Sequence, residues 1–144
     1  MNGINGLGHL NLLVSDLDRS LVFYRDQLGL QEMTRLVRDS GETWLVYLRI
    51  TDLQYLELMT QASNDRAPAN GLAGVNHLCL TIDDLGVEAA RLAAAGVVLT
   101  SKIKLGQDGN RGAWIEDPDG NRIELMEMHP DCLQYKAIRA LSAG

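Results

Sequence analysis

The sequence predicts an α+β fold in which two paired βαβββ modules make up a single domain of 144 residues. Two observations carry this prediction. Both halves show the same order of strand and helix patterns, and both contain a histidine and a glutamate at nearly the same interval. His9 and Glu57 are 48 residues apart, and His77 and Glu124 are 47 residues apart. A framework repeated in this way indicates two related structural units.

Residues 7–61 form the first predicted module. Alternating apolar residues indicate a strand at its start, apolar residues at helical spacing indicate a helix, and three further runs indicate three strands. The expected elements are a strand over 8–14, a helix over 17–28 and strands near 31–38, 43–50 and 53–60. We expect Ser15 or Asp16 to cap the helix at its N-terminus and Gly29 to end it.

Residues 75–128 repeat this plan and form the second module. Its expected elements are a strand over 75–82, a helix over 84–95 closed by Gly96, and strands near 97–104, 111–116 and 122–128. The run 117–121, Asp-Pro-Asp-Gly-Asn, predicts a tight hairpin turn. Residues 62–74, which include Pro68, are small and polar as in a linker, and residues 129–144 predict a short amphipathic helical tail.

Charge and composition narrow the class of protein. Hydrophobic residues make up 46% of the chain, and 13 basic residues against 19 acidic ones give a net charge of -6. A compact globular protein is expected, and nucleic acid and anionic membranes are disfavoured as partners. Lys102, Lys104 and Arg111 are too sparse to bind a phosphate backbone, but they could hold one anionic group of a small substrate.

The two cysteines and the N-terminus favour a cytoplasmic protein. Cys79 lies in an apolar run, where a buried thiol is expected, and a disulfide with Cys132 is not. No basic and apolar leader begins the chain, and no apolar run approaches the roughly 20 residues that span a bilayer. We therefore expect a cytoplasmic protein.

The repeated His and Glu residues predict a metal site. Strand alternation places each of them on the more polar face of its strand. If the first and last strands of each half lie side by side, each half presents one imidazole and one carboxylate. We expect His9, Glu57, His77 and Glu124 to bind one divalent metal ion, and the N2O2 donor set suits Ni, Co, Zn, Mn or Fe. Coordination positions left open would make the site catalytic.

Several other residues are candidates for contact with a substrate. Asn11, Thr81 and Arg122 share the faces that carry the ligands, and Arg122 could equally be a surface residue. Trp114 is predicted either as core or as pocket wall. His129 has no counterpart in the first half and is expected to be a surface residue in preference to a lid or a substrate contact.

Two stretches carry a resemblance to a known family. They are His9 to Tyr24, with its Ser-Asp-Leu-Asp-Arg-Ser and Phe-Tyr sequences, and Glu116 to Glu124. Over residues 7–128 the chain resembles the vicinal oxygen chelate superfamily. This superfamily includes glyoxalase I, bleomycin-resistance proteins, fosfomycin-resistance transferases, methylmalonyl-CoA epimerase and extradiol dioxygenases. The resemblance implies modules that form a curved sheet around a metal cleft, within one chain or between two swapped chains, and a homodimer.

Within this superfamily the ligand pattern looks most like that of glyoxalase I. Dioxygenases generally use two His and one Glu, so Glu57 makes that activity a weaker prediction. Bacterial glyoxalase I enzymes hold the glutamyl end of glutathione with an Arg and an Asn, where this chain has Leu13 and Gln61. Gln61 could replace its counterpart, but Leu13 carries no charge. The resemblance therefore implies the metal chemistry and does not extend to glutathione as cosubstrate.

The sequence as a whole predicts a metal-dependent lyase or isomerase. Chelation of a hydroxycarbonyl substrate by the metal would acidify its C–H bond, and Glu124 or Glu57 would move the proton. An epimerase or isomerase of another hydroxycarbonyl compound is the alternative enzyme. A non-catalytic resistance protein that binds a drug-like molecule is the alternative from another class.

Overall fold

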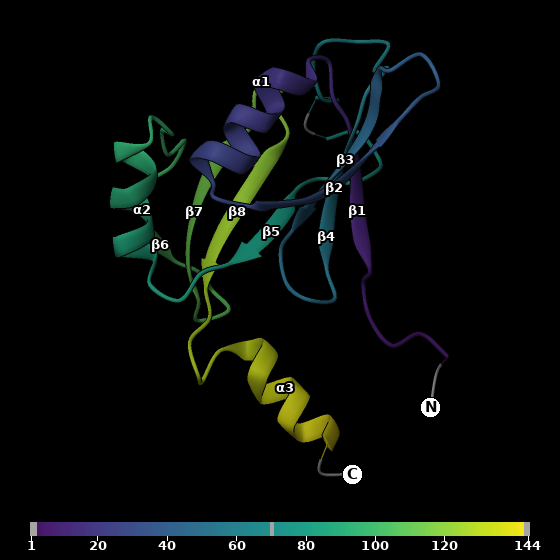
Figure 1. The fold of residues 1–144 in the computed structure, drawn as a ribbon. Coiled ribbons are helices and arrows are strands. Elements are labelled where there is room, and N and C mark those ends of the chain that lie inside the picture. The colour runs from purple at the N-terminus through teal and green to yellow at the C-terminus, as the bar shows by residue number, and fades with distance from the viewer. Residues whose placement is uncertain (1–2, 70, 143–144) are drawn as a thin grey trace. The chain divides into compact units, whose positions relative to one another are not determined.

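The computed structural model describes residues 3–69 and 71–142, and the chain divides into two compact units, 1–67 and 68–144. The boundary falls inside the predicted linker, 62–74, whose described residues form no helix or strand. Each unit contains one four-stranded mixed sheet, so the predicted α+β class is confirmed (Figure 1).

The first unit has the predicted order of elements. They are β1 (His9–Leu13), α1 (Leu17–Leu21), the π-helix η1 (Val22–Gln27), β2 (Gln31–Val37), β3 (Thr43–Arg49) and β4 (Tyr55–Met59). The strand order in the sheet is β1-β4-β3-β2, with β1 parallel to β4 and the other neighbours antiparallel. The first and last strands of the half therefore lie side by side, as the metal hypothesis requires.

The second unit repeats this arrangement and adds a helix. Its elements are β5 (Leu78–Thr81), α2 (Leu85–Ala94), β6 (Lys104–Leu105), β7 (Arg111–Glu116), β8 (Arg122–Glu127) and α3 (Leu133–Ser142). The strand order is β5-β8-β7-β6, again with the first and last strands of the repeat parallel. In Figure 1, α3 follows β8 as the C-terminal helix.

The repeat extends to the starts of the first two helices. The carboxylate of Asp16 accepts the backbone N–H of Arg19 at 3.0 Å, and that of Asp84 accepts the backbone N–H of Val87 at 3.0 Å. Each bond satisfies an amide that has no partner inside its helix. Of the two predicted caps for the first helix, the structure selects Asp16.

Two predicted elements differ in the structure. The helix over 17–28 is an α-helix only as far as Leu21, and Val22–Gln27 forms a π-helix, with Leu28 N–H bonded to the carbonyl of Phe23 at 2.8 Å. The predicted strand 97–104 is reduced to Lys104–Leu105, because the hydroxyl of Ser101 accepts the amide of Trp114 at 3.1 Å and interrupts the backbone ladder.

Strand alternation in each sheet separates a buried face from a polar one. Leu56 and Leu58 of β4 are fully buried, as are Ile123 and, almost completely, Leu125 of β8. Burial of one such side chain contributes about 1.5–3 kcal/mol. Because neighbouring residues on a strand point to opposite faces, Glu57 and Glu124, which lie between these apolar residues, are on the other face of each sheet.

Candidate metal centre

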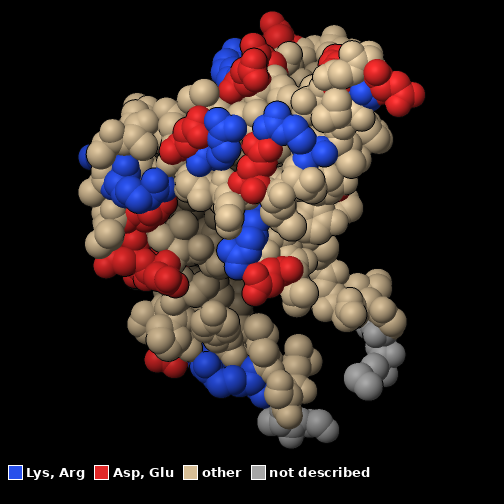
Figure 2. Space-filling model, viewed as in Figure 1, with Lys and Arg blue, Asp and Glu red and all other residues tan. Residues whose placement is uncertain are grey.

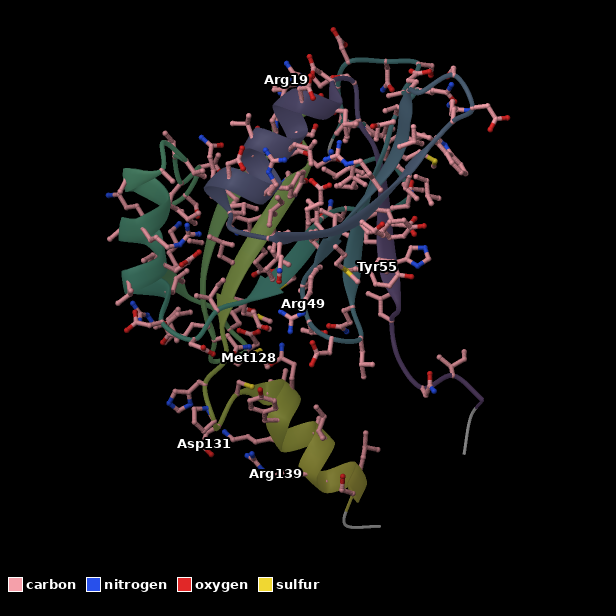
Figure 3. The ribbon with its side chains drawn as sticks, in the orientation of Figure 1. Arg19, Arg49, Tyr55, Met128, Asp131 and Arg139 are labelled. Carbon is pink, nitrogen blue, oxygen red and sulfur yellow. The ribbon has the colours of Figure 1, made fainter. Side chains whose placement is uncertain are left out.

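The first unit brings its predicted ligands together. His9 stands at the start of β1, and Glu57 lies on the adjacent parallel strand β4. The distance from His9 Nε2 to Glu57 Oε2 is 3.6 Å. The His9 ring stacks on Tyr55 with ring centroids 5.3 Å apart, and Tyr55 is labelled on β4 in Figure 3. Packing against Tyr55 thus supports the imidazole beside the carboxylate.

Glu57 is held by a second polar neighbour. Asn11 pairs with Glu57 in the β1–β4 register, and its Nδ2 donates a hydrogen bond of 2.9 Å to Glu57 Oε2. Across the sheet, Tyr47 pairs with Glu57, and burial together with the nearby carboxylate raises the pKa of its phenol. Asn11 is therefore placed to orient a ligand rather than to act as one.

The second unit holds the matching pair at a similar distance. His77 immediately precedes β5, and its Nε2 lies 3.3 Å from Glu124 Oε2 on β8. On the other side of the ring, Nδ1 lies 2.9 Å from Oδ1 of Asn76. With its proton on Nδ1 the ring would donate to this oxygen and leave Nε2, the nitrogen 3.3 Å from Glu124, able to bind a metal. Asn76 was not predicted from the sequence, although its position next to a candidate ligand was an available signal.

Trp114 and Arg122 surround the second pair. The edge of the His77 ring packs on Trp114 with centroids 4.8 Å apart, and the Arg122 guanidinium lies 4.4 Å from the centroid of the Trp114 ring. Arg122 also donates to Asn76 Oδ1 at 3.3 Å. Of its two predicted environments, core or pocket wall, Trp114 occupies the second: it is half-buried and lines a pocket together with Glu124.

This pocket lies within the second unit and has a volume of about 330 Å³. Gly112 and Trp114 of β7 and Glu124 and Met126 of β8 form part of its wall. The basic residues singled out from the sequence also line it. They are Lys102, Lys104 and Arg111.

The prediction that the Cys79 thiol is buried is wrong. Cys79 is exposed, Cys132 is buried, and both are free, so the expected absence of a disulfide between them holds for the structure. Cys79 pairs with Glu124 in the β5–β8 register and therefore lies on the polar face. Its partial burial and the Glu124 carboxylate raise the pKa of the thiol to about 11.

The remaining predicted residues lie at the surface. Gln61 follows β4 with a positive φ of 79°, Thr81 is exposed opposite Met126, and Leu13 is exposed at the end of β1. His129 is exposed, as expected, and its backbone N–H donates to Oδ1 of Asn110. In the described part of the chain, no contact of these residues indicates a role in binding metal or substrate.

The chemistry of the donors fits a divalent ion. Each unit offers one imidazole nitrogen and one carboxylate oxygen, 3.3 to 3.6 Å apart, and two donors each about 2.0–2.2 Å from one ion can be this far apart. Within residues 3–69 and 71–142, no group of three or more His, Cys, Asp or Glu side chains is close enough to hold a metal. The four-ligand site therefore stays a prediction.

Charge on the visible surface is largely paired. On the face shown in Figure 2, basic and acidic side chains lie in small neighbouring groups. Arg35 and Glu32 form an ion pair of 2.6 Å, and Arg25 and Asp26 form one of 2.7 Å. Such pairing lowers the free positive charge available to a polyanion. None of the described helices has the length and apolar character needed to cross a bilayer.

Comparisons with known proteins agree with this architecture. The family model described as Glyoxalase/Bleomycin resistance protein/Dioxygenase superfamily matches residues 6–125. The lactoylglutathione lyase of Haemophilus influenzae is 29% identical over 83% of this chain and 90% of its own length, and the uncharacterised protein YwbC of Bacillus subtilis is 28% identical over 84% and 96%.

One solved structure extends the comparison to a protein described as binding an antibiotic. The antibiotic binding protein TnmS3 from Streptomyces sp. CB03234 superposes with a TM-score of 0.69 at 25% identity, over 90% of this chain and all of that one. The family model covers most of the chain, including both His and Glu pairs. The protein therefore belongs to the glyoxalase/bleomycin resistance protein/dioxygenase superfamily.

Proposed function

We propose that the protein is a divalent-metal-dependent lyase or isomerase that moves a proton on a hydroxycarbonyl substrate, as in glyoxalase I. The observation that carries the proposal is the recurrence of a paired imidazole and carboxylate in both units, at 3.6 and 3.3 Å. A structural repeat alone would be satisfied by apolar residues at these positions. The similarity to a lactoylglutathione lyase over most of both chains supports the same activity.

The proposed ligands are His9, Glu57, His77 and Glu124. Both glutamate side chains are mostly shielded from solvent, with exposed fractions of 13% for Glu57 and 25% for Glu124. Each carboxylate faces an imidazole nitrogen at 3.3 to 3.6 Å, and a divalent cation would bind both donors of such a pair. When bound, the ion would supply a Lewis acid that stabilises negative charge on adjacent substrate oxygens.

The residues of the chain supply the proton transfer and its positioning. Glu124 or Glu57 takes the proton from the carbon next to the carbonyl and returns it to the neighbouring carbon. The two carboxylates have different neighbours. Asn11 donates to Glu57 and holds its carboxylate in place, whereas Glu124 borders an open pocket. We therefore assign the base to Glu124 and an orienting role to Asn11.

The proposed substrate differs from that of the glutathione-dependent enzymes. Leu13 is apolar and Gln61 is exposed in a left-handed backbone conformation, so neither offers a charged contact to a glutamyl group. We propose a hydroxycarbonyl substrate without glutathione, handled in the cytoplasm by a homodimer. Sedimentation analysis with and without metal tests the dimer.

Metal analysis and a substitution test the proposal together. Protein purified without affinity-tag metal should contain one divalent ion per chain, and Glu57→Gln should lower metal affinity by at least the roughly 10- to 100-fold typical of groups that only orient ligands. Glu116→Gln, an exposed glutamate at the end of β7, is the matched control. Wild-type affinity and activity in Glu57→Gln would remove Glu57 from the ligand set.

Activity is tested with metal-reconstituted protein. The substrates are α-ketoaldehydes with and without thiols, and a panel of hydroxycarbonyl compounds that would also reveal an epimerase. Oxygen uptake with catechols and Fe(II) would indicate a dioxygenase instead. Turnover that requires both the metal and Glu124 supports the proton-transfer function, and turnover that survives Glu124→Gln contradicts the assignment of the base.

The second candidate is a non-catalytic binding protein. The specific observation in its favour is the structural similarity to an antibiotic binding protein at a TM-score of 0.69. The pocket of about 330 Å³ in the second unit is in the size range of small-molecule sites. A chain that binds no metal, gains no stability from metal and shows saturable binding of a drug-like compound would establish this function in place of the enzyme.

A further inference from the structure

The pocket of the second unit shares a sheet face with the proposed base. In the register of the sheet, Lys104 pairs with Gly112, and Gly112 pairs with Met126. In the neighbouring row Trp114 pairs with Glu124. Side chains in adjacent rows of one face are two residues apart along each strand and can contact one small molecule.

Gly112 leaves a gap in this face. A Cβ atom at this position would lie 3.4 Å from Glu124 Oε1. Because glycine has no side chain, the space between Lys104 and Glu124 is open to a ligand. The surrounding pocket has a volume of about 330 Å³, enough for a compound of a few carbons with its substituents.

The two lysines of this pocket are available for a ligand. Lys102 and Lys104 both line it and are exposed, and neither forms an ion pair with a described residue. The chain contains only one other lysine, Lys136 on α3. Two of its three lysines therefore face the pocket that contains Glu124.

The other charged groups of the pocket already have partners. Arg111 forms an ion pair of 3.0 Å with Glu127, and Asp108 accepts hydrogen bonds from Asn110 and Gln134, each at 2.8 Å. Glu124 is next to His77 at 3.3 Å. The cations of the pocket wall that have no ion pair with a described residue are therefore Lys102 and Lys104, whereas the carboxylates of Asp108 and Glu124 contact amides and an imidazole.

We propose that Lys102 and Lys104 bind an anionic group, a carboxylate or a phosphate ester, carried by the substrate. This inference rests on the proposed function in one respect: it assumes that Glu124 acts on the same substrate molecule whose anionic group the lysines bind. The gap at Gly112 then separates the reacting carbon from the anionic group. Substrates of this class are hydroxycarbonyl acids or hydroxycarbonyl phosphates of a few carbons.

Calorimetric titration tests the proposal with three probes that differ in charge. Dihydroxyacetone is neutral, hydroxypyruvate adds a carboxylate, and dihydroxyacetone phosphate adds a phosphate ester. We expect each anionic probe to bind about fivefold to tenfold more tightly than the neutral one, as for a partly exposed charge-assisted contact. The advantage should shrink as KCl is raised. The two anionic arms distinguish a carboxylate from a phosphate substrate.

Methionine substitutions identify the groups responsible. Lys102→Met and Lys104→Met keep an unbranched side chain and remove the charge, and Lys136→Met is the matched control on α3. The double substitution at 102 and 104 should bring the anionic probes to the affinity of dihydroxyacetone, whereas Lys136→Met should leave the difference unchanged. Equal affinities in the wild-type protein, or a difference that survives the double substitution, overturn the proposal.

The titrations are run on chelator-treated and on zinc-loaded protein, because an anionic group could also bind directly to a metal ion. Contact with the metal would not depend on the lysines. A lysine-dependent preference in chelated protein supports the anion pocket even if the protein binds no divalent metal, an outcome that would refute only the proposed function. Zinc binding without a lysine-dependent preference refutes only the anion pocket.

Discussion

At the scale of single residues, Glu57 and His77, two of the proposed ligands, are held by uncharged polar neighbours. Asn11 donates to Glu57 in the first unit, and Asn76 contacts the Nδ1 of His77 in the second. Hydrogen bonds of this kind fix the orientation of a ligand before a metal binds. The two units therefore support different members of their pairs, the carboxylate in one and the imidazole in the other.

Removal of the Asn11 amide should weaken metal binding without removing a ligand. We expect Asn11→Ala to lower metal affinity roughly 10-fold, the lower end of the range for groups that orient ligands. Titration with a metal indicator measures this change. Asn64→Ala is the control, because the side chain of Asn64 is exposed and bonds only within its own loop in the described structure. An unchanged affinity in Asn11→Ala would show that Glu57 needs no such support.

At the scale of elements, the caps of α1 and α2 show how the repeat is encoded locally. In each module an aspartate directly precedes the helix and satisfies an amide three residues later. The cap of α2 can be tested by urea denaturation. Asp84→Ala should lower the free energy of unfolding by about 1 kcal/mol, whereas Asp83→Ala, one residue before the cap and exposed, should change it far less. Equal losses would contradict a capping role.

The attachment of α3 should depend on pH. Hydrogen bonds from Gln134 and Asn110 hold the pKa of the Asp108 carboxyl below its usual range, and its backbone carbonyl accepts the amide of Leu133. A lowered pKa in the folded state means that this stabilisation is present at neutral pH. It is lost as the pH falls from the ordinary carboxyl range through the lowered value.

NMR measurement of the amides of residues 133–142 during an acid titration checks this expectation. Their signals should show loss of helix in acid before those of β7 and β8 do. Gln134→Ala, which removes the first contributor to the shift, should move the loss of helix to higher pH. A transition that coincides with global unfolding in both proteins would show that Asp108 does not control α3.

At the scale of the whole molecule, the proposed metal would link the stability of the chain to ligand binding. An ion that binds only the folded state stabilises it by about 2.7 kcal/mol at a free concentration one hundred times its Kd. We expect the melting temperature of chelated protein to rise when metal is added, and the rise to disappear in Glu57→Gln and Glu124→Gln. A rise of equal size in these variants would place the metal elsewhere.

The sequence by itself determined the order of the elements and the identity of the paired residues, and it narrowed the cap of the first helix to Ser15 or Asp16. These features depend on local periodicity and on the repeat. The repeat placed His9 and Glu57 on the first and last strands of one half. Periodicity does not distinguish an α-turn from a π-turn, which is why η1 was missed.

Only the tertiary structure decided the features that depend on contacts between distant residues. Ser101 takes the amide of Trp114 and shortens β6, and the β5–β8 register places Cys79 beside Glu124 instead of in the core. The β6–β7 register pairs Lys104 with Gly112, and Lys102 lines the same pocket. The physical reason is that register and side-chain competition for backbone amides are settled by pairing between strands, and a single strand does not encode its partner.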